Sequence, residues 1–162
     1  FWRKSPPNFG DIKIGELLER CVTLSQHKME LSHIQLRFSV PNGLPVVYGD
    51  FNQLQQVVIN LIFNAIDAMP EGGELYLTGD YDSAAREIEI SIKDTGKGIA
   101  EEDLPHIFEP FFTTKKEGYG VGLGLSTVYG IIEHHNGQIK VDSRKGNGTT
   151  FKIELPVRGT AA

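Results

Sequence analysis

The chain is short of several residue types, and each shortage excludes a class of protein. Its 162 residues include one cysteine, Cys21, which rules out an internal disulfide framework and is a poor metal site by itself. The formal net charge of -5 leaves no basic surplus for a general nucleic-acid-binding protein. No apolar run approaches the roughly 18 residues of a membrane span, and no signal-peptide pattern opens the chain. These absences predict a cytoplasmic segment with no nucleic-acid partner and no membrane contact of its own, and they leave open whether a longer parent is membrane-anchored.

The composition that is present is that of one ordinary globular domain. With 40% hydrophobic and 23% charged residues, the chain is long enough to bury a single core. Residues 1–10 mix aromatic, basic and proline residues without periodicity, which predicts a linker. We expect the domain to span residues 11–157 and a tail to occupy residues 158–162. Because the chain begins with Phe1 rather than Met, we expect it to be a fragment of a longer protein.

Helical and alternating apolar patterns follow one another along the domain, and their order indicates the fold class. A helix is predicted after Asp11, with an apolar face made of Ile14, Leu17, Leu18, Cys21, Leu24 and Met29. Further helices are predicted at residues 50–69, at 101–106 and from Gly124 to about Asn136. Strands are predicted at residues 35–40, 46–48, 74–81, 87–93, 138–142 and 150–155. This order predicts an α+β fold: a two-layer α/β sandwich whose mixed, largely antiparallel sheet is covered on one face by helices.

The predicted helix at residues 50–69 carries one narrow polar stripe on an otherwise apolar surface. At about 100° per residue, the stripe falls within a wedge of about 80° and consists of Gln53, Gln56, Asn60, Asn64 and Asp67. So narrow a stripe predicts that these side chains line a polar cavity. An amphipathic helix with a thin solvated edge would give the same pattern, and the helix alone does not decide between the two.

Three later segments have compositions that suit ligand binding. Gly120, Gly122 and Gly124 precede an apolar helix, where backbone N–H groups and the helix N-terminus favour an anion such as a phosphate. Asp94, beside glycines at the end of a strand, can accept a hydrogen bond from an exocyclic amino group. The aromatic run at residues 107–112 precedes a glycine-containing loop that could close as a lid. Each segment also has an ordinary explanation, respectively a flexible linker, a surface turn and a set of core aromatics.

Taken in order, these segments resemble one family. Residues 60–68, 94–99, 108–112 and 120–125 are similar to the N, first glycine, F and second glycine boxes of the Bergerat ATP-binding fold, in its sensor histidine kinase branch. The segments FEPFFTTK and GLGLS are most similar to those of the nitrogen-regulator type of kinase. The resemblance covers residues 11–157, nearly the whole chain, and rests on degenerate motifs that stand in the family's order.

The resemblance implies a role for each matching residue. Asn64 matches the ligand of the Mg²⁺ ion that bridges the nucleotide phosphates, and Asn60 lies beside it one turn earlier. Asp94 matches the aspartate that receives the adenine amino group, in a pocket shaped by Gly96 and Gly98. The second glycine box matches the lid hinge and the triphosphate contact, and the phenylalanines match the lid base; they are Phe108, Phe111 and Phe112. The implied ATP-binding residues are Asn60, Asn64, Asp67, Asp94, Gly96, Gly98, Ile99, Phe108, Phe112, Thr113, Thr114, Lys115, Gly120, Val121, Gly122, Leu123, Gly124 and Leu125.

The sequence departs from the family pattern in two places. Many of these kinases carry a basic residue three positions after the magnesium asparagine and another after the F box, where this chain has Asp67 and Thr113. We expect Lys115 or Lys116 to supply the missing charge beside the phosphates, with Asn60 and Lys115 as the catalytic residues. Asp67 would then be an outer-shell partner of the magnesium ion through water.

The resemblance implies the domain of a protein-histidine kinase that binds ATP and Mg²⁺. It would transfer the γ-phosphoryl group to a histidine on a separate dimerising helical hairpin, from which the group passes to an aspartate of a response regulator. None of the 5 histidines here has the phosphoacceptor pattern, so we expect the acceptor upstream, with residues 1–10 as the tail of its hairpin. The fragment would then be a monomer and the parent protein a dimer.

Two other functions remain open at this point. ATP-hydrolysing relatives of the same fold, such as the gyrase, mismatch-repair and heat-shock branches, carry a general-base glutamate at the position of Asn60. An amide has no useful basicity, which argues against hydrolysis. The non-enzymatic alternative is a degenerate module that only binds a partner protein, against which Asn64 and the glycines argue.

Overall fold

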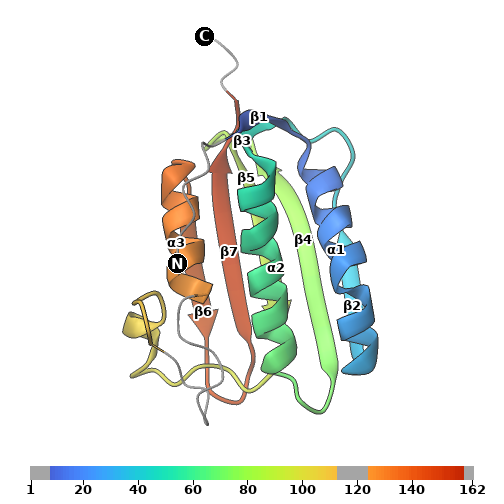
Figure 1. Cartoon of the computed structure of the whole chain (residues 1–162), viewed down its shortest axis with the longest axis vertical. Helices are drawn as coiled ribbons and strands as arrows, with labels where there is room; N and C mark the ends of the chain where they lie inside the picture. Colours follow the sequence, from blue (N-terminus) through green and yellow to red (C-terminus); the bar gives the residue numbers. More distant parts are fainter. Residues whose placement is uncertain (1–7, 113–123, 159–162) are drawn as a thin grey trace.

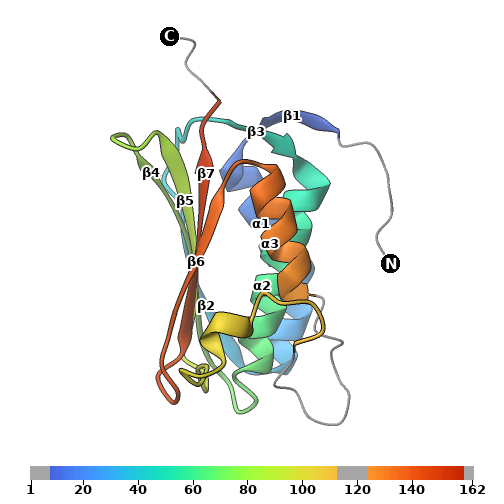
Figure 2. The same cartoon turned by 90° about the vertical axis from the view of Figure 1, so that its left-hand side faces the viewer.

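A computed structural model describes residues 8–112 and 124–158. Within these ranges, three α-helices lie side by side on one face of a five-stranded sheet, and a two-stranded sheet closes one end (Figures 1 and 2). The predicted two-layer α/β sandwich is therefore confirmed. The elements are β1 (Phe9–Ile12), α1 (Ile14–Leu31), β2 (Ile34–Ser39), β3 (Val47–Asp50), α2 (Phe51–Asp67), β4 (Gly73–Asp82), β5 (Glu87–Asp94), the 3-10 turn η1 (Leu104–His106), α3 (Gly124–His134), β6 (Gln138–Ser143) and β7 (Thr149–Pro156).

The five-stranded sheet has one apolar and one charged face. Its order is β2-β4-β5-β7-β6, and among the described strands only β2 and β4 pair in parallel. Side chains alternate between the faces, so that Leu77, Ile92 and Phe151 align across three neighbouring strands and are buried. The opposite face carries charged side chains, among them the Arg37–Glu74 ion pair at 3.1 Å. The helices cover the apolar face, and the charged face is left to solvent (Figure 2).

α2 is the central helix and lies between α1 and α3 over the sheet (Figure 1). It begins after Asp50, whose Oδ1 accepts the backbone N–H of Gln53 at 3.1 Å and so caps the first turn. Burial of each leucine, isoleucine or valine contributes about 1.5–3 kcal/mol, and the buried residues of α2 are Leu54, Val57, Val58, Leu61, Ile62, Ala65 and Ile66. Phe63, an aromatic residue of the same helix, is 36% exposed and lies under the Nζ of Lys28. None of the helices in the described ranges is long and apolar enough to cross a membrane.

The apolar face of α1 follows the prediction except at one turn. Cys21 is fully buried, and burial raises the pKa of its thiol to about 12, which makes it an unreactive core residue. Ser25 is also fully buried, whereas Leu24, expected on this face, is 52% exposed. At about 100° per residue, Ser25 continues the line of Cys21, and Leu24 lies at the edge of the buried stripe.

The N-terminal segment differs from the prediction. Residues 9–12 form β1, which pairs antiparallel with β3, although the sequence predicts a linker up to residue 10 and a helix start near Asp11. α1 instead begins after Lys13, and the Asp11 carboxylate accepts a hydrogen bond from Arg158 at 2.8 Å. The four residues FGDI do not alternate apolar and polar side chains, and their partner strand lies far along the chain, so only the tertiary pairing reveals β1.

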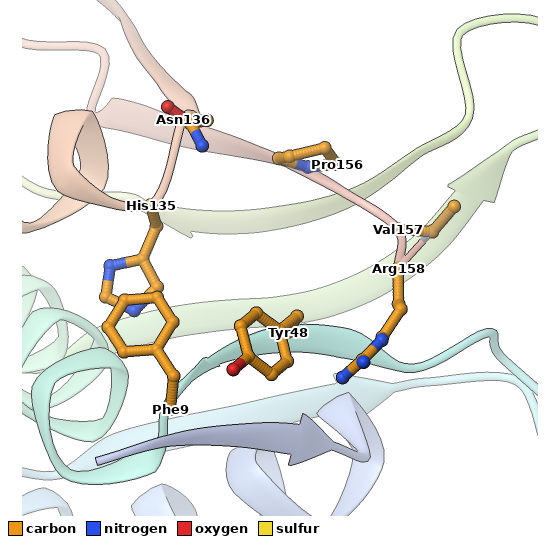
Figure 3. Close-up of a pocket in the computed structure, with 7 residues that line it drawn as sticks. All are labelled: Phe9, Tyr48, His135, Asn136, Pro156, Val157 and Arg158. Atoms are coloured by element: carbon orange, nitrogen blue, oxygen red, sulfur yellow. The ribbon is translucent and has the colours of Figure 1, made fainter. Parts of the chain in front are cut away.

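His135 joins α3, β3 and β1 at one end of the sandwich (Figure 3). Its side chain is buried, with 4% exposed. Because a carbonyl can only accept, Nδ1–H donates to the Ile131 oxygen at 2.8 Å, which leaves Nε2 to accept the N–H of Asp50 at 3.0 Å. The Phe9 ring stacks on the imidazole with 4.8 Å between centroids. Burial, and secondly the neighbouring His134, lower the pKa of His135, so the ring is neutral in the folded domain.

Acidification is expected to destabilise the fold through His135. Because its folded pKa is lowered, the unfolded chain takes up the proton first as the pH falls through about 6.5, and the free energy of unfolding then declines by up to about 1.4 kcal/mol per pH unit. His135→Gln cannot take up this proton, so urea titrations between pH 7.5 and 5.5 should show a shallower decline. His27→Gln, on the exposed side of α1, should keep the slope of the unsubstituted domain. Equal slopes for the unsubstituted domain and His135→Gln would contradict the assignment.

Candidate functional site

The loop from Asp94 to Ile99 is held between the end of α2 and the turn that joins β6 to β7. On one side, the N–H of Lys97 donates to the carbonyl of Ala68, the residue that follows α2, at 3.0 Å. On the other side, the Lys97 carbonyl accepts the N–H of Gly146 at 2.6 Å. Gly98 has a φ of 72°, and a Cβ there would collide with a backbone carbonyl of the β6–β7 turn. The loop therefore requires glycine where it passes against this turn.

Asp94 is a buried carboxylate whose two oxygens have different surroundings. The residue ends β5 and is 5% exposed. Its Oδ1 accepts the backbone N–H groups of Gly96 at 2.8 Å and of Thr149 at 3.2 Å, whereas no residue in the described ranges donates to Oδ2. Burial raises the pKa of Asp94, and the two N–H groups act in the opposite direction. One oxygen is thus fixed by the backbone, and the other is left for a donor such as an amino group.

Two amides of the α2 stripe lie in the half of the helix that leads to this loop. Asn60 and Asn64 are half-buried, and along the helix axis they precede Ala68 by about 12 and 6 Å. Within the described part of the chain, neither amide has a hydrogen-bond partner. Gln53, nearer the start of α2, is also half-buried, and Asp67 is exposed. Two unengaged amides on a helix packed this well suit a polar ligand better than a solvated edge.

α3 begins at the same end of the sandwich as the Asp94 loop. Figure 1 shows α2 and α3 side by side and running in opposite directions, and the two helices are in contact. Gly124, the first described residue of α3, has open space around it, and Leu125 is half-buried. The partial positive charge of the helix N-terminus is therefore directed to the end where Asn64 and Asp94 lie. This end combines an anion-binding helix terminus with an acceptor for an amino group.

Comparison with known proteins identifies the family to which the chain belongs. Residues 49–159 match the family described as histidine kinase-, DNA gyrase B-, and HSP90-like ATPase. The match includes α2, the Asp94 loop, α3 and β7, which together form the site. The chain belongs to this ATPase family.

The most similar proteins place the chain in the sensor histidine kinase branch of the family. Sporulation kinase E of Bacillus subtilis (strain 168) is 40% identical over 151 residues, which cover 91% of this chain and 20% of that kinase. Sensor histidine kinase ZraS of Escherichia coli (strain K12) is 40% identical over 149 residues, which cover 92% of this chain and 31% of ZraS. The chain thus spans about a fifth to a third of the curated relatives that it matches.

Solved structures show which part of such kinases the chain represents. The catalytic domain of the histidine kinase ThkA, solved nucleotide-free, is 34% identical with a TM-score of 0.82, and the match covers 93% of this chain and 96% of that domain. ThkA in complex with the response regulator protein TrrA matches with 32% identity and a TM-score of 0.78, over 93% of this chain and 42% of that chain. The chain is the ATPase domain of the sensor histidine kinase type.

The aromatic residues of the F box divide between core and surface in this ATPase domain. Phe108 is half-buried, with its ring centroid 5.4 Å from that of Tyr129 on α3 and 6.3 Å from that of Phe151 on β7. Phe112 is also half-buried. Phe111, by contrast, is 74% exposed and has a φ of 68°, so core packing does not account for all three phenylalanines. The short helix predicted at residues 101–106 is reduced to the single turn η1.

Part of the predicted site lies outside the described residues. Its members are Thr113, Thr114, Lys115, Lys116, Gly120, Val121, Gly122 and Leu123, and their predicted roles stay predictions. The remaining predicted residues lie on the second half of α2, on the Asp94 loop, on the segment around η1 and at the described start of α3, and they are Asn60, Asn64, Asp67, Asp94, Gly96, Gly98, Ile99, Phe108, Phe112, Gly124 and Leu125.

Two residues at the β6–β7 connection belong to the site although the sequence marks them only as neighbours of a turn. Thr149, which is 5% exposed, donates its N–H to Asp94 from 55 positions along the chain. Ser143 lies opposite Thr149 in the sheet and contacts it through the hydroxyl groups at 2.8 Å. The nearby Gly148 has a φ of 79°, and a Cβ there would collide with the Asp94 carbonyl. The paired glycines of RKGNG are the one sequence signal that could have found this contact.

A groove of about 530 Å³ lies at the other end of the sandwich and is separate from the ATP site. It runs between Phe9, Tyr48 and His135 on one side and the end of β7 with Arg158 on the other (Figure 3). Arg158 is already engaged there, because its guanidinium lies 4.3 Å from the Tyr48 ring centroid and donates to Asp11. The length of α2 separates this groove from Asp94, so the groove is a feature of the His135 junction.

Gly98→Ala tests the close approach of the Asp94 loop to the β6–β7 turn. The strained φ and the collision should lower the free energy of unfolding by about 1–3 kcal/mol and weaken ATP binding with it. Gly130→Ala is the matched control, because Gly130 has open space on the exposed side of α3 and alanine there should stabilise the helix by up to about 1 kcal/mol. Urea unfolding and ATP calorimetry on both variants provide the comparison. If Gly98→Ala is as stable as Gly130→Ala, the loop does not need glycine at this position.

Proposed function

We propose that this domain binds Mg-ATP and transfers the γ-phosphoryl group to a histidine on a separate helical hairpin, for relay to a response-regulator aspartate. The observation that carries the proposal is that the Asp94 loop is joined to the end of α2, whose second half carries the unengaged amides of Asn60 and Asn64, and that α3 begins at the same end of the fold. The similarity to sensor histidine kinases over the whole domain supports the same reaction.

Asp94 is proposed to recognise the adenine base. The backbone N–H groups of Gly96 and Thr149 fix its Oδ1, so Oδ2 is held ready to accept the exocyclic amino group of adenine. Guanine would present a carbonyl oxygen at the same place, and two acceptors repel one another. Gly96 and Gly98 keep the loop close to α2 and to the β6–β7 turn, and Ile99, which is half-buried, gives the base an apolar neighbour.

Asn60 and Asn64 are proposed to face the phosphates, with Asn64 as the magnesium ligand. No group of three or more His, Cys, Asp or Glu side chains in the described ranges is placed to hold a metal ion by itself. An amide oxygen suits Mg²⁺, which commonly takes one or two protein oxygens and completes its shell with substrate phosphates and water. The donor set therefore fits an ion that arrives with the nucleotide, where it would neutralise phosphate charge. Asp67 is proposed as an outer-shell partner through water.

Phosphoryl transfer needs positioning and charge compensation more than a protein base. The imidazole nitrogen of the acceptor attacks the γ-phosphorus, a P–N bond forms, the bond to the β-phosphate oxygen breaks, and ADP leaves with the electron pair. The described residues that would position ATP for this step are Asn60 on α2 and the helix terminus at Gly124. Lys115 is proposed as the additional charge beside the phosphates, and Thr113, Thr114 and the glycines at 120–124 as parts of the lid.

The partners follow from the same proposal. The acceptor hairpin and a response regulator are the proposed protein partners, and the solved complex of ThkA with TrrA supports the second. We place the domain in the cytoplasm as a monomer when isolated, with dimerisation in the hairpin of the parent protein. Residues 1–10 are proposed as the connection to that hairpin, although β1 already begins at Phe9. The predicted tail at residues 158–162 starts one residue later than expected, because Arg158 is bonded to Val46 and Asp11, and residues 159–162 remain proposed as a tail.

The function is tested by mixing the domain with ATP labelled at the γ-phosphate and with the phosphoacceptor hairpin of its parent protein. Label on the hairpin should be acid-labile and base-stable, as phosphohistidine is. Asp94→Asn should slow labelling about 10–100-fold at subsaturating ATP, because it disrupts a hydrogen bond to a charged acceptor. Asp80→Asn, on the exposed face of β4, is the matched control and should label normally. Acid-stable label, or no label with a folded domain, would overturn the proposed function.

Asn60 is proposed as the reason that the γ-phosphoryl group is transferred to a protein and not to water. Asn60→Glu supplies a general base one helical turn before Asn64, so phosphate release from ATP should rise at least about tenfold. Asn60→Gln, which extends the side chain to the same length without basicity, is the control and should release phosphate no faster than the unsubstituted domain. If Asn60→Glu and Asn60→Gln release phosphate at the same rate, the missing base is not what limits hydrolysis.

A further inference from the structure

The Ser143 hydroxyl lies where three parts of the site meet. Ser143 ends β6 and stands opposite Thr149, the first residue of β7. Its Oγ accepts the backbone N–H of Ile99 at 2.8 Å, lies 2.8 Å from the Thr149 hydroxyl, and lies 3.1 Å from the Gly148 carbonyl. The single hydroxyl thus links the Asp94 loop to both strands beyond it.

The chemistry of these partners fixes the direction of each hydrogen bond. A backbone N–H can only donate and a carbonyl can only accept, so Ser143 accepts from Ile99 and donates its one hydrogen to Gly148. Its second lone pair then accepts the Thr149 hydroxyl hydrogen. All three contacts are satisfied at once only in this arrangement. Ser143 is therefore saturated and has no capacity left for a ligand.

The saturated hydroxyl acts on Asp94 through its neighbours. Thr149, held by Ser143 through its side chain, donates its backbone N–H to Asp94 Oδ1, and Ile99 closes the loop that Asp94 begins. Loss of the hydroxyl would leave the N–H of the half-buried Ile99 without its partner and release the Thr149 side chain. The contact of Lys97 with Gly146 would still hold the middle of the loop against the turn. The expected consequence is a shift of the carboxylate with the loop still in place.

We propose that Ser143 is a positioning residue that sets base selectivity: it aligns Ile99 and Thr149 so that Asp94 discriminates adenine from guanine. This inference rests on the proposed function, because it requires Asp94 to receive a nucleotide base. Ser143 itself touches no substrate. Its contacts are all on the base side of the site and none is with α2 or α3, so it does not act on the phosphates.

The test is magnesium-containing calorimetry of Ser143→Ala with ATP, GTP and inorganic tripolyphosphate. Loss of one net hydrogen bond should weaken ATP binding about tenfold and reduce the ATP-over-GTP preference by a similar factor. Tripolyphosphate carries no base, so its affinity should change by less than about twofold. Ser143→Thr keeps the hydroxyl and should restore the ATP-over-GTP preference to within about threefold. Ser91→Ala, on the outer face of β5, is the control and should behave as the unsubstituted domain.

Amide hydrogen exchange without nucleotide gives a second, independent readout. The N–H of Ile99 should exchange faster in Ser143→Ala than in the unsubstituted domain or Ser143→Thr, because its acceptor is gone. The N–H of Ile90, in the middle of β5, should be unaffected in all of them. Loss of folding in Ser143→Ala, judged by urea unfolding, would overturn a role confined to base selection.

The possible failures of the inference and of the proposed function are distinguishable. If Asp94→Asn binds ATP more weakly than the unsubstituted domain, two results for Ser143→Ala would overturn the inference alone. One is an unchanged ATP-over-GTP preference, and the other is an equal loss of affinity for ATP and for tripolyphosphate. An unsubstituted domain that does not bind ATP, or an Asp94→Asn variant with full affinity, would overturn the proposed function and the inference together.

Discussion

The candidate site depends on how the Asp94 carboxylate is held inside the protein. A carboxylate that is 5% exposed loses most of its hydration, which is costly unless other donors replace the water. Two backbone N–H groups do so, and one comes from the adjacent loop while the other comes from the first residue of β7. The carboxylate therefore exists in this position only if β5, β7 and the loop are all in register. The position of the carboxylate thus depends on the register of β5 and β7.

Backbone geometry keeps this arrangement compact. Gly98 and Gly148 have positive φ values, and side chains at these positions would collide with neighbouring carbonyls. The end of α2 contributes the Ala68 carbonyl to the same loop, so the helix with the polar stripe and the strand with the carboxylate share one hydrogen-bonded junction. The site is assembled from elements that are rigid for other reasons: α2 is buried on most sides, and β5 and β7 are interior strands.

Much of this could be predicted from the sequence because the relevant signals are local. Periodicity places α2 and β5, and the stripe of amides on α2 needs only the helical repeat. The contacts that complete the site are not local: Thr149 reaches Asp94 across 55 positions, and Ser143 reaches Ile99 across 44. β1 escapes prediction for a related reason, since its four residues show no alternation and become a strand only beside β3. Ser25 and Phe63 show a further limit, because a residue near the edge of a helical stripe is buried or exposed according to its neighbours.

The position of the first and last described residues has a mechanical consequence. Asn8 donates to Asp50, and Arg158 donates to the Val46 carbonyl, so both ends of the described chain are fastened beside β3, at the start of α2. The Asp94 loop lies at the other end of that helix, which at 17 residues is about 25 Å long. The two ends of the described chain therefore lie on the opposite side of the domain from the Asp94 loop, and the length of α2 separates them from it.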